Sequence, residues 1–221
     1  MNGWLALVGG HEWTEGCRPI DEALLRETDA KEVLVVPTAA AYEHPQRTIE
    51  AATEYFGALG AKVRALDVLG RPAASDEANV KLVKKAKLVY IGDGSPLHLR
   101  AVLKDTPVWD ALVAAWSDGC AVAGTGAGAM ALGDPMVDPR GGAFTLGLGL
   151  MPSMAAMTQT EGWHHETKRR TIQLATKGLP LVAVDDATAA MRSPEGAWSV
   201  VGVGTATVYV DGKEVSLTRL P

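Results

Sequence analysis

The stretch with the clearest chemical meaning is a glycine-rich turn at residues 124–129, which reads Gly-Thr-Gly-Ala-Gly-Ala. An apolar run at 120–123 precedes it, and a helix is expected after it. This layout is typical of a nucleophile elbow, a tight turn that holds a Ser or Cys between a strand and a helix. Small neighbours are needed because such a turn brings backbone segments close together. The central residue here is Gly126, which has no attacking atom.

Glycine has a specific consequence at that position. The central residue of an elbow has an unfavourable backbone conformation, which costs a residue with a Cβ roughly 1–3 kcal/mol. Glycine carries no such penalty. Gly126 is therefore predicted to preserve the turn while removing the nucleophile, although a plain glycine-rich strand-to-helix turn would have the same sequence pattern.

Short apolar runs and helical patterns alternate through the first 130 residues. Strands are predicted at 4–8, 32–36, 62–66, 88–91 and 120–123, and helices at 44–59, 76–85, 97–103 and 108–116. This alternation predicts βαβ units and a mostly parallel sheet with helices on both faces. The strands are apolar throughout rather than alternating, as expected when both faces are covered.

The last third of the chain changes character. Short β runs at 181–184, 188–191, 198–203 and 207–210 are separated by turn residues, and Asp211-Gly212 is a hairpin signal. A helix is expected at 166–176. We predict an α/β protein in which residues 1–221 form a single domain, with a C-terminal antiparallel β extension of the sheet.

Composition excludes several classes of function. The 221 residues carry a net charge of −5 and no basic stripe, which argues against nucleic acid as a partner. No signal peptide or membrane span is apparent, so a cytoplasmic protein without membrane association is expected. The two cysteines do not make a disulfide framework, and Cys120 is expected to be buried.

Two further glycine clusters should lie near the elbow. Ligands collect at the carboxyl ends of strands in open α/β sheets. Gly9-Gly10 and Gly92-Asp93-Gly94 each follow a predicted strand, as residues 124–129 do. The three clusters are therefore expected to meet at one edge of the sheet.

These motifs carry a resemblance along nearly the whole chain. The matching segments are Gly-Gly-His-Glu-Trp at 9–13, Val-Pro-Thr-Ala-Ala at 36–40, Leu-Gly-Ala at 59–61, Ile-Gly-Asp-Gly-Ser at 91–95, the turn at 124–129, Gly-Leu-Gly-Leu-Met-Pro at 147–152 and Val-Asp-Asp-Ala-Thr-Ala at 184–189. In order and spacing they resemble the dipeptidase E and cyanophycinase family of serine peptidases. The resemblance implies a fold like that of class I glutamine amidotransferases.

The resemblance also implies a catalytic Ser, a His and an acidic partner, and here the match fails. The nucleophile position is Gly126. The family's His lies shortly after the Gly-Leu-Gly-Leu segment, and the register places Thr158 there. The acid could survive as Asp134 or Asp138, but an acid without base and nucleophile does nothing.

The family's oxyanion hole needs only backbone N–H groups. The resemblance places these at Asp93, Gly94 and Ala127. Asp93 stands where the family often has Gly, and its carboxylate would repel an anionic ligand if it pointed into the site.

Other residues could supply chemistry. Thr125 neighbours the elbow centre and carries a hydroxyl. His164 and His165 could provide a shifted base, or metal ligands together with Glu161 or Glu166. Their spacing matches no common zinc pattern, so a solvated surface loop is the simpler interpretation and no metal is expected.

The remaining candidates are rim residues. His11 and His98 follow the first and fourth strands and are expected at the edge of the site. Trp13, Trp163 and Phe144 could line a pocket or pack under loops.

The sequence thus predicts a serine-peptidase homologue without ordinary Ser-His activity, whose site binds a small peptide or amino-acid-like ligand or is vestigial. The alternative is a hydrolase of aspartyl peptides or a related amide with rearranged residues, using Thr125 or a water activated by a nearby His. No cofactor is expected, and the resemblance implies a homodimer.

Overall fold

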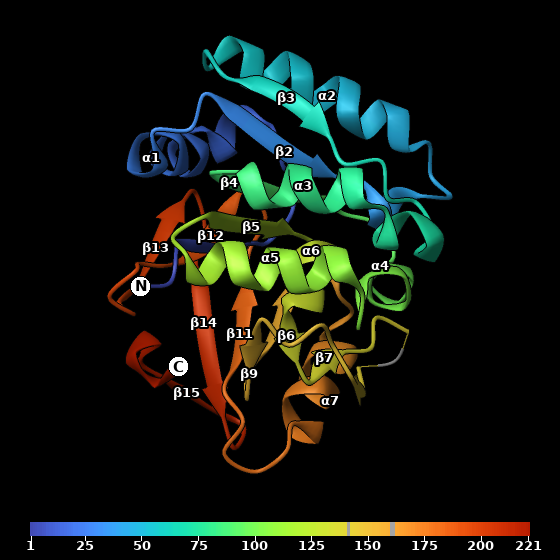
Figure 1. The fold of residues 1–221 in the computed structure, drawn as a ribbon. Helices are drawn as coiled ribbons and strands as arrows, with labels where there is room; N and C mark the ends of the chain where they lie inside the picture. The colour runs from blue at the N-terminus through green and yellow to red at the C-terminus, as the bar shows by residue number, and fades with distance from the viewer. Residues whose placement is uncertain (141, 160–161) are drawn as a thin grey trace.

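A seven-stranded sheet forms the centre of the computed structural model, which describes residues 1–140, 142–159 and 162–221 (Figure 1). The strand order is β13-β12-β1-β5-β4-β2-β3. The strands are β1 (Leu5–Val8), β2 (Glu32–Val36), β3 (Lys62–Ala65), β4 (Leu88–Ile91), β5 (Ala121–Thr125), β12 (Thr188–Arg192) and β13 (Trp198–Gly202). The first five run parallel, whereas β12 and β13 are antiparallel to their neighbours.

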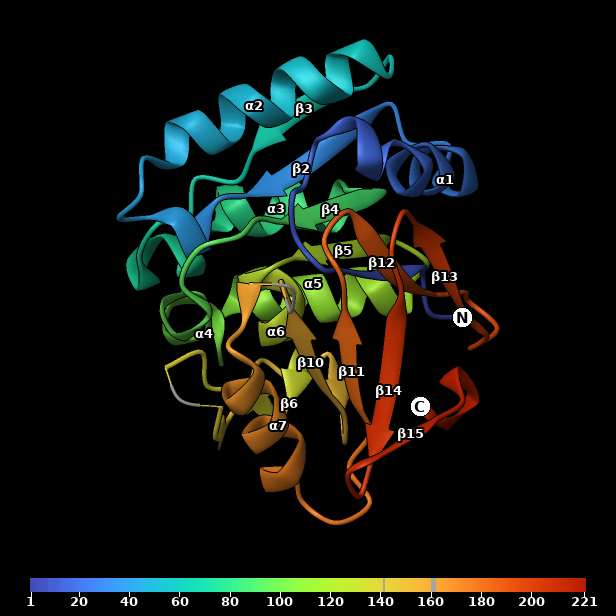
Figure 2. The same cartoon turned by 180° about the vertical axis from the view of Figure 1, so that it is seen from behind.

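Helices cover both faces of this sheet. On one face lie α1 (Arg18–Thr28) and α2 (Pro45–Ala58), and on the other α3 (Glu77–Lys85), α4 (Pro96–Leu103), α5 (Pro107–Ser117) and α6 (Ala127–Leu132). Figure 2 shows the side with α1 and α2. Side chains of β4 alternate between two cores, since Tyr90 packs with α1 and α2 while Val89 packs with the other helices. The predicted α/β architecture, with a large, mostly parallel sheet flanked by helices, is confirmed.

The C-terminal region differs from the expectation in one respect. Only β12 and β13 extend the main sheet. A second sheet has the order β10-β11-β14-β15 and is formed by β10 (Ala155–Thr158), β11 (Leu181–Val184), β14 (Ala206–Val210) and β15 (Lys213–Val215). The difference arises because β11 pairs with β10 in parallel, and the chain turns at Ala187 (φ 50°) before β12 joins β1.

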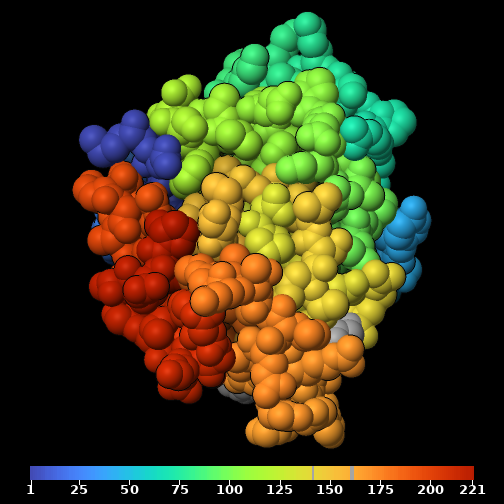
Figure 3. All heavy atoms as spheres, turned by 90° about the horizontal axis from the view of Figure 1, so that it is seen from below, coloured from blue at the N-terminus to red at the C-terminus, as the bar shows by residue number. Residues whose placement is uncertain are grey.

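Smaller elements complete the fold. They are β6 (Gly133–Asp134), β7 (Met136–Val137), β8 (Phe144–Thr145), β9 (Met151–Pro152), α7 (His165–Leu174) and the 3₁₀ turns η1 (Glu15–Cys17), η2 (Thr38–Ala40), η3 (Arg71–Ser75) and η5 (Leu217–Arg219). Figure 3 shows that the C-terminal half, coloured yellow to red, forms most of the surface on this side. Residues of both sheets share one buried cluster, which includes Val122 and Val182.

Local sequence signals account for several element ends. Asp76 caps α3, because its side chain accepts a hydrogen bond from the Ala78 N–H at 2.8 Å. Gly60 follows α2 with φ 79°, and Asp211 and Gly212 (φ 50° and 76°) turn the chain from β14 to β15. Helix α1 has no counterpart among the sequence predictions.

The expectation for Cys120 is confirmed. Its thiol is buried and free, and burial raises its pKa to about 12. Among the described residues, no helix combines the length and apolar character needed to cross a membrane.

Candidate functional site

Gly126 lies in a sharp turn between β5 and α6. Its backbone angles are φ 51° and ψ −115°, and its N–H donates to the Val8 carbonyl at 3.1 Å. Residues with a Cβ rarely adopt this conformation. The strand, the turn and the helix therefore have the arrangement of a nucleophile elbow.

The glycines around Gly126 are required by close backbone contacts. A Cβ on Gly124 would lie 2.7 Å from the Gly128 carbonyl carbon, and one on Gly128 would lie 2.5 Å from the Ile91 carbonyl oxygen. The glycine-rich sequence thus allows α6 to begin directly against β4 and β5.

The space beside Gly126 is occupied by the carboxylate of Asp93. A Cβ on Gly126 would overlap both carboxylate oxygens. Asp93 Oδ1 accepts hydrogen bonds from the backbone N–H groups of Gly94 and Ala127, each at 2.7 Å. Gly94 and Ala127 are two of the three residues whose amides were expected to hold the negative charge of a reacting substrate, and here these two amides bind a carboxylate of the chain itself.

A second side chain reaches this carboxylate from the end of β10. Gln159 Nε2 donates to Asp93 Oδ2 at 2.6 Å, and the Gln159 N–H donates to the Gly9 carbonyl at 2.8 Å. Gln159 has φ 54°, while Thr158 before it is buried as the last residue of β10. The side chain that this segment hydrogen-bonds to Asp93 is therefore Gln159 rather than Thr158. A carboxamide cannot serve as a base by taking up a proton at neutral pH.

Glu12 and Thr125 form another pair near Asp93. The Thr125 hydroxyl donates to Glu12 Oε2 at 3.2 Å. Burial raises the pKa of the Glu12 carboxyl, and the nearby negative charge of Asp93 raises it further. Thr125 is fully buried, so a substrate carbonyl has no access to its hydroxyl, and the structure gives no support to Thr125 as a nucleophile.

The two candidate acids are engaged elsewhere. Asp134 Oδ1 accepts from the Gly147 N–H at 3.1 Å. Asp138 Oδ2 forms an ion pair with Arg140 Nη2 at 2.7 Å, and hydrogen bonds from Arg140 lower the pKa of the Asp138 carboxyl. Within the described part of the chain, neither acid has a hydrogen bond to Thr158, so neither orients a group at the predicted base position.

His11 and His98 are not directed at the elbow by any hydrogen bond that the structure shows. The His11 side chain is 71% exposed, and its Nε2 lies 3.8 Å from Asp186 Oδ2. His98 Nε2 lies 3.1 Å from the Leu69 carbonyl oxygen. Both positions suit rim residues rather than catalysts.

His164 caps α7. Its Nδ1 accepts from the Glu166 N–H at 3.4 Å, and His165 is the first residue of the helix. Glu161, the other acid considered with them, lies outside the described residues. In the ranges that the structure describes, no three His, Cys, Asp or Glu side chains are grouped to hold a metal ion.

A small cavity of about 110 Å³ opens beside Asp93. Its lining comprises Asp93, Gly94, Pro96, Ala127, Met130, Pro139, Thr158, Gln159 and Trp163. Trp163 thus lines the cavity as the sequence suggested, whereas Trp13 packs against Tyr90 with ring centroids 5.7 Å apart. Phe144 lies half-buried in β8 against the core.

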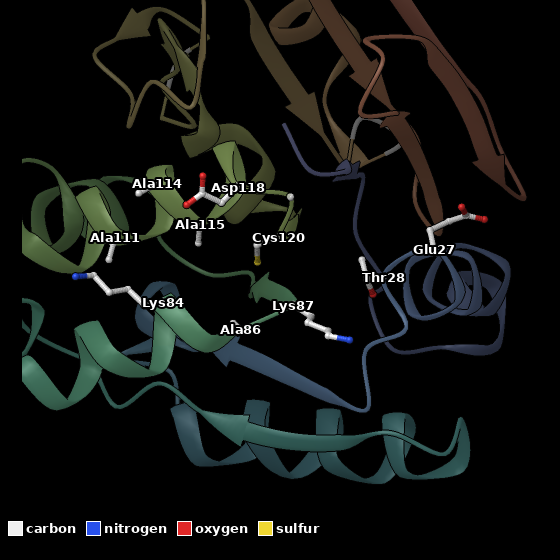
Figure 4. A pocket seen from close by; sticks show the side chains of 11 residues that line it. Glu27, Thr28, Lys84, Ala86, Lys87, Ala111, Ala114, Ala115, Asp118 and Cys120 are labelled. Atoms are coloured by element: carbon white, nitrogen blue, oxygen red, sulfur yellow. The ribbon is translucent and has the colours of Figure 1, made fainter. Parts of the chain in front are cut away.

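A larger hollow of about 600 Å³ lies at the opposite end of the strands (Figure 4). Lys87 and Cys120, which line it, immediately precede β4 and β5, whereas Asp93 and Gly126 follow the same two strands. Ligand sites in open parallel sheets form at the carboxyl ends of the strands. The small cavity at Asp93 is therefore the candidate site despite its size.

Sequence reasoning missed Gln159 as a member of this site. Its only sequence signal was its position next to Thr158, in the segment where the resemblance places the family's His. Glu12 entered the sequence analysis only as part of the Gly-Gly-His-Glu-Trp segment at 9–13, although its carboxyl is close enough to Asp93 for the two charges to interact.

The main sheet, the elbow turn and the paired backbone amides define an α/β protein of the nucleophile-elbow type. A model of peptidase family S51 matches residues 5–189, and the chain belongs to that family.

Curated relatives include cyanophycinases. The chain is 25% identical to the enzyme of Geminocystis herdmanii over 203 residues, which cover 85% of this chain and 72% of that protein. It is 25% identical to the enzyme of a Nostoc species over 229 residues, covering 97% of this chain and 76% of that protein.

Solved structures show the same fold. A peptidase from an acI-B1 actinobacterium has a TM-score of 0.86 at 26% identity, covering 97% of this chain and 93% of the other. A candidate peptidase E from Listeria monocytogenes has a TM-score of 0.69 at 15% identity, covering 92% and 100%, which supports the fold alone.

Proposed function

We propose that this family S51 protein does not hydrolyse peptides by serine chemistry, and that its elbow site instead binds a small peptide or amino-acid-like ligand. The observation that carries the proposal is the Asp93 carboxylate, which fills the space beside Gly126 and accepts from both Gly94 and Ala127 N–H groups.

Two physical reasons support the loss of hydrolysis. Removing triad members lowers rates by several orders of magnitude, and what remains comes from the oxyanion hole and substrate binding. Here two of the amides proposed to form the oxyanion hole already donate to Asp93. A substrate oxyanion would have to displace a carboxylate held by three N–H donors, and then lie beside its charge.

The direct test is an assay of the purified protein with an α-aspartyl dipeptide and with β-aspartyl-arginine. No turnover above background is expected. Turnover that persists through stringent purification, and that disappears in Asp93→Ala, would contradict the proposal.

A reconstruction tests the reason for the loss. Gly126→Ser combined with Asp93→Gly and Gln159→His restores nucleophile, free amides and base, and some hydrolysis is expected. Gly126→Ser alone should restore none. The same variant with Thr158→His in place of Gln159→His tests the register predicted from the sequence, because only one of the two positions can present a base to the new hydroxyl at position 126.

A second candidate is a hydrolase of aspartyl peptides or a related amide with rearranged residues. The observation favouring it is the Glu12 carboxyl, whose pKa is raised by burial beside Asp93, since paired carboxyl groups in unlike environments can act as acid and base. If turnover is found, Glu12→Gln should abolish it, while the matched exposed change Glu15→Gln should not.

A further inference from the structure

The cavity at the elbow is lined by the carboxylate of Asp93. A carboxylate offers about four lone-pair sites. At Asp93, Oδ1 accepts from Gly94 and Ala127, and Oδ2 accepts from Gln159. Counting donors from the described residues alone, one acceptor position on Oδ2 is left, and Asp93 and Gln159 both line the cavity.

In the part of the chain that the structure describes, no Lys or Arg side chain pairs with this carboxylate. Across the described residues, neither Asp93 nor Glu12 forms an ion pair with a Lys or Arg. The donors to Asp93 among the described residues are neutral N–H groups, and Glu12 adds a second acidic group close by. A cation entering the cavity would be attracted by both acids, whereas an anion would be repelled.

The walls of the cavity suit the apolar part of a small ligand. Pro96, Met130 and Trp163 line it together with the polar residues. Aromatic rings attract ammonium groups that approach within about 6 Å of the ring centre. The volume of about 110 Å³ corresponds to roughly four water molecules in the liquid, so it admits the end of a ligand rather than a whole peptide.

We propose that this cavity binds the ammonium end of a small amine or amino-acid-like ligand, with Asp93 Oδ2 as acceptor, and that Asp93 selects ammonium over carboxylate groups. The inference rests on the proposed function, because a site that performed serine-type hydrolysis would need the Gly94 and Ala127 amides for an oxyanion.

The experiment is an NMR titration of the full chain with propylammonium chloride, sodium propionate and 1-propanol at constant ionic strength. The signals to follow are the Trp163 indole N–H and the amides of Gly94 and Ala127. Propylammonium should shift them saturably, whereas propionate and 1-propanol should bind at least tenfold more weakly.

Variants separate charge from shape. Asp93→Asn keeps the size of the side chain and should weaken propylammonium binding at least tenfold. Asp118→Asn removes the same charge beside the larger hollow and should leave binding unchanged. Asp93→Ala frees the two amides, so propionate should now shift Gly94 and Ala127, which would invert the selectivity of the site.

Equal binding of propylammonium and propionate by the unmodified chain, or no saturable shift with propylammonium, would overturn the proposal. These outcomes differ from failure of the proposed function, which would appear as turnover of aspartyl peptides in the separate assay.

Discussion

Gly126 and Asp93 fit one another sterically. The carboxylate of Asp93 occupies the volume into which any side chain at 126 would project, and glycine is the residue that leaves that volume open. A missing nucleophile alone could be a simple loss. The amides of Gly94 and Ala127 donate to Asp93, so the atoms around Gly126 form a hydrogen-bonded arrangement that includes no nucleophile.

The close contact between Gly126 and the Asp93 carboxylate predicts that Gly126→Ser lowers the stability of the protein. The new Cβ would overlap the Asp93 carboxylate and would sit at φ 51° and ψ −115°. We expect the free energy of unfolding to fall by roughly 2–5 kcal/mol, from backbone strain together with overpacking. Urea unfolding of the variant and the unmodified chain measures the change.

The control is the same substitution in an Asp93→Gly background. There the overlap is gone and only backbone strain remains, so the cost should be smaller by about 1 kcal/mol or more. Equal costs in the two backgrounds would show that the Asp93 carboxylate does not limit what fits at position 126.

At the scale of elements, the site depends on how closely α6 approaches β4 and β5. Gly124 and Gly128 allow this approach, because side chains there would meet backbone atoms rather than flexible side chains. The oxyanion-type amides can converge on Asp93 only while that approach is kept.

Gly124→Ala should therefore destabilise the protein by roughly 1–3 kcal/mol, because its Cβ would lie 2.7 Å from Gly128 backbone. Gly57→Ala is the matched control, since Gly57 lies in α2 with no atom within 4 Å of an added Cβ. It should stabilise by about 0.5–1 kcal/mol, as expected for glycine replaced within a helix. Thermal or urea unfolding of both variants distinguishes crowding at the elbow from a general effect of added methyl groups.

At the scale of the whole molecule, a buried acid of α1 lies beside side chains of α2 and β4. Asp21 of α1 is fully buried, with the hydroxyl-bearing residues Tyr55 and Tyr90 beside it. None of these three side chains completes a well-formed hydrogen bond within the described chain. Burial raises the pKa of the Asp21 carboxyl to about 7, the two hydroxyls oppose this shift, and the charge of Glu12 adds to it.

Stability should consequently fall as the pH rises from about 4 to about 7. In that interval an unfolded Asp, with its ordinary pKa of 3.8, loses its proton while the folded protein retains it. The folded state is favoured by this group below the unfolded pKa, and the advantage is gone above the folded pKa. A shift of this size corresponds to a change on the order of 4 kcal/mol.

Asp21→Asn should remove this dependence. From pH 4 to pH 7 the unmodified chain should lose stability relative to the variant. Above pH 7 the difference between their free energies of unfolding should stay constant. Denaturant unfolding across this range measures it. A difference that stays constant with pH would mean that Asp21 does not titrate in the folded protein.

The homodimer inferred from the family resemblance stays a prediction. Multi-angle light scattering at micromolar concentration should give twice the mass of one chain. A monomer under these conditions would rule out a role that depends on a stable dimer.

The sequence by itself determined the parallel core of the fold and the shape of the elbow. Strands β2, β4 and β11 begin and end at the predicted residues, because runs of apolar residues and the turn residues that end them are local properties of the chain. Gly126, at φ 51° and ψ −115°, likewise lies in the sharp turn that the local glycine-rich sequence predicted.

Only the tertiary structure decided what fills the elbow. Asp93 and Gln159 are 66 residues apart in the chain, and they meet because β4 lies next to β5 while β10 belongs to a second sheet that ends at the same place. Local patterns identify strands but do not assign them to sheets, since apolar runs in β11 and β12 look alike yet pair with different partners. The chemistry at Gly126 follows from that assignment, because it sets which polar side chain faces the two amides.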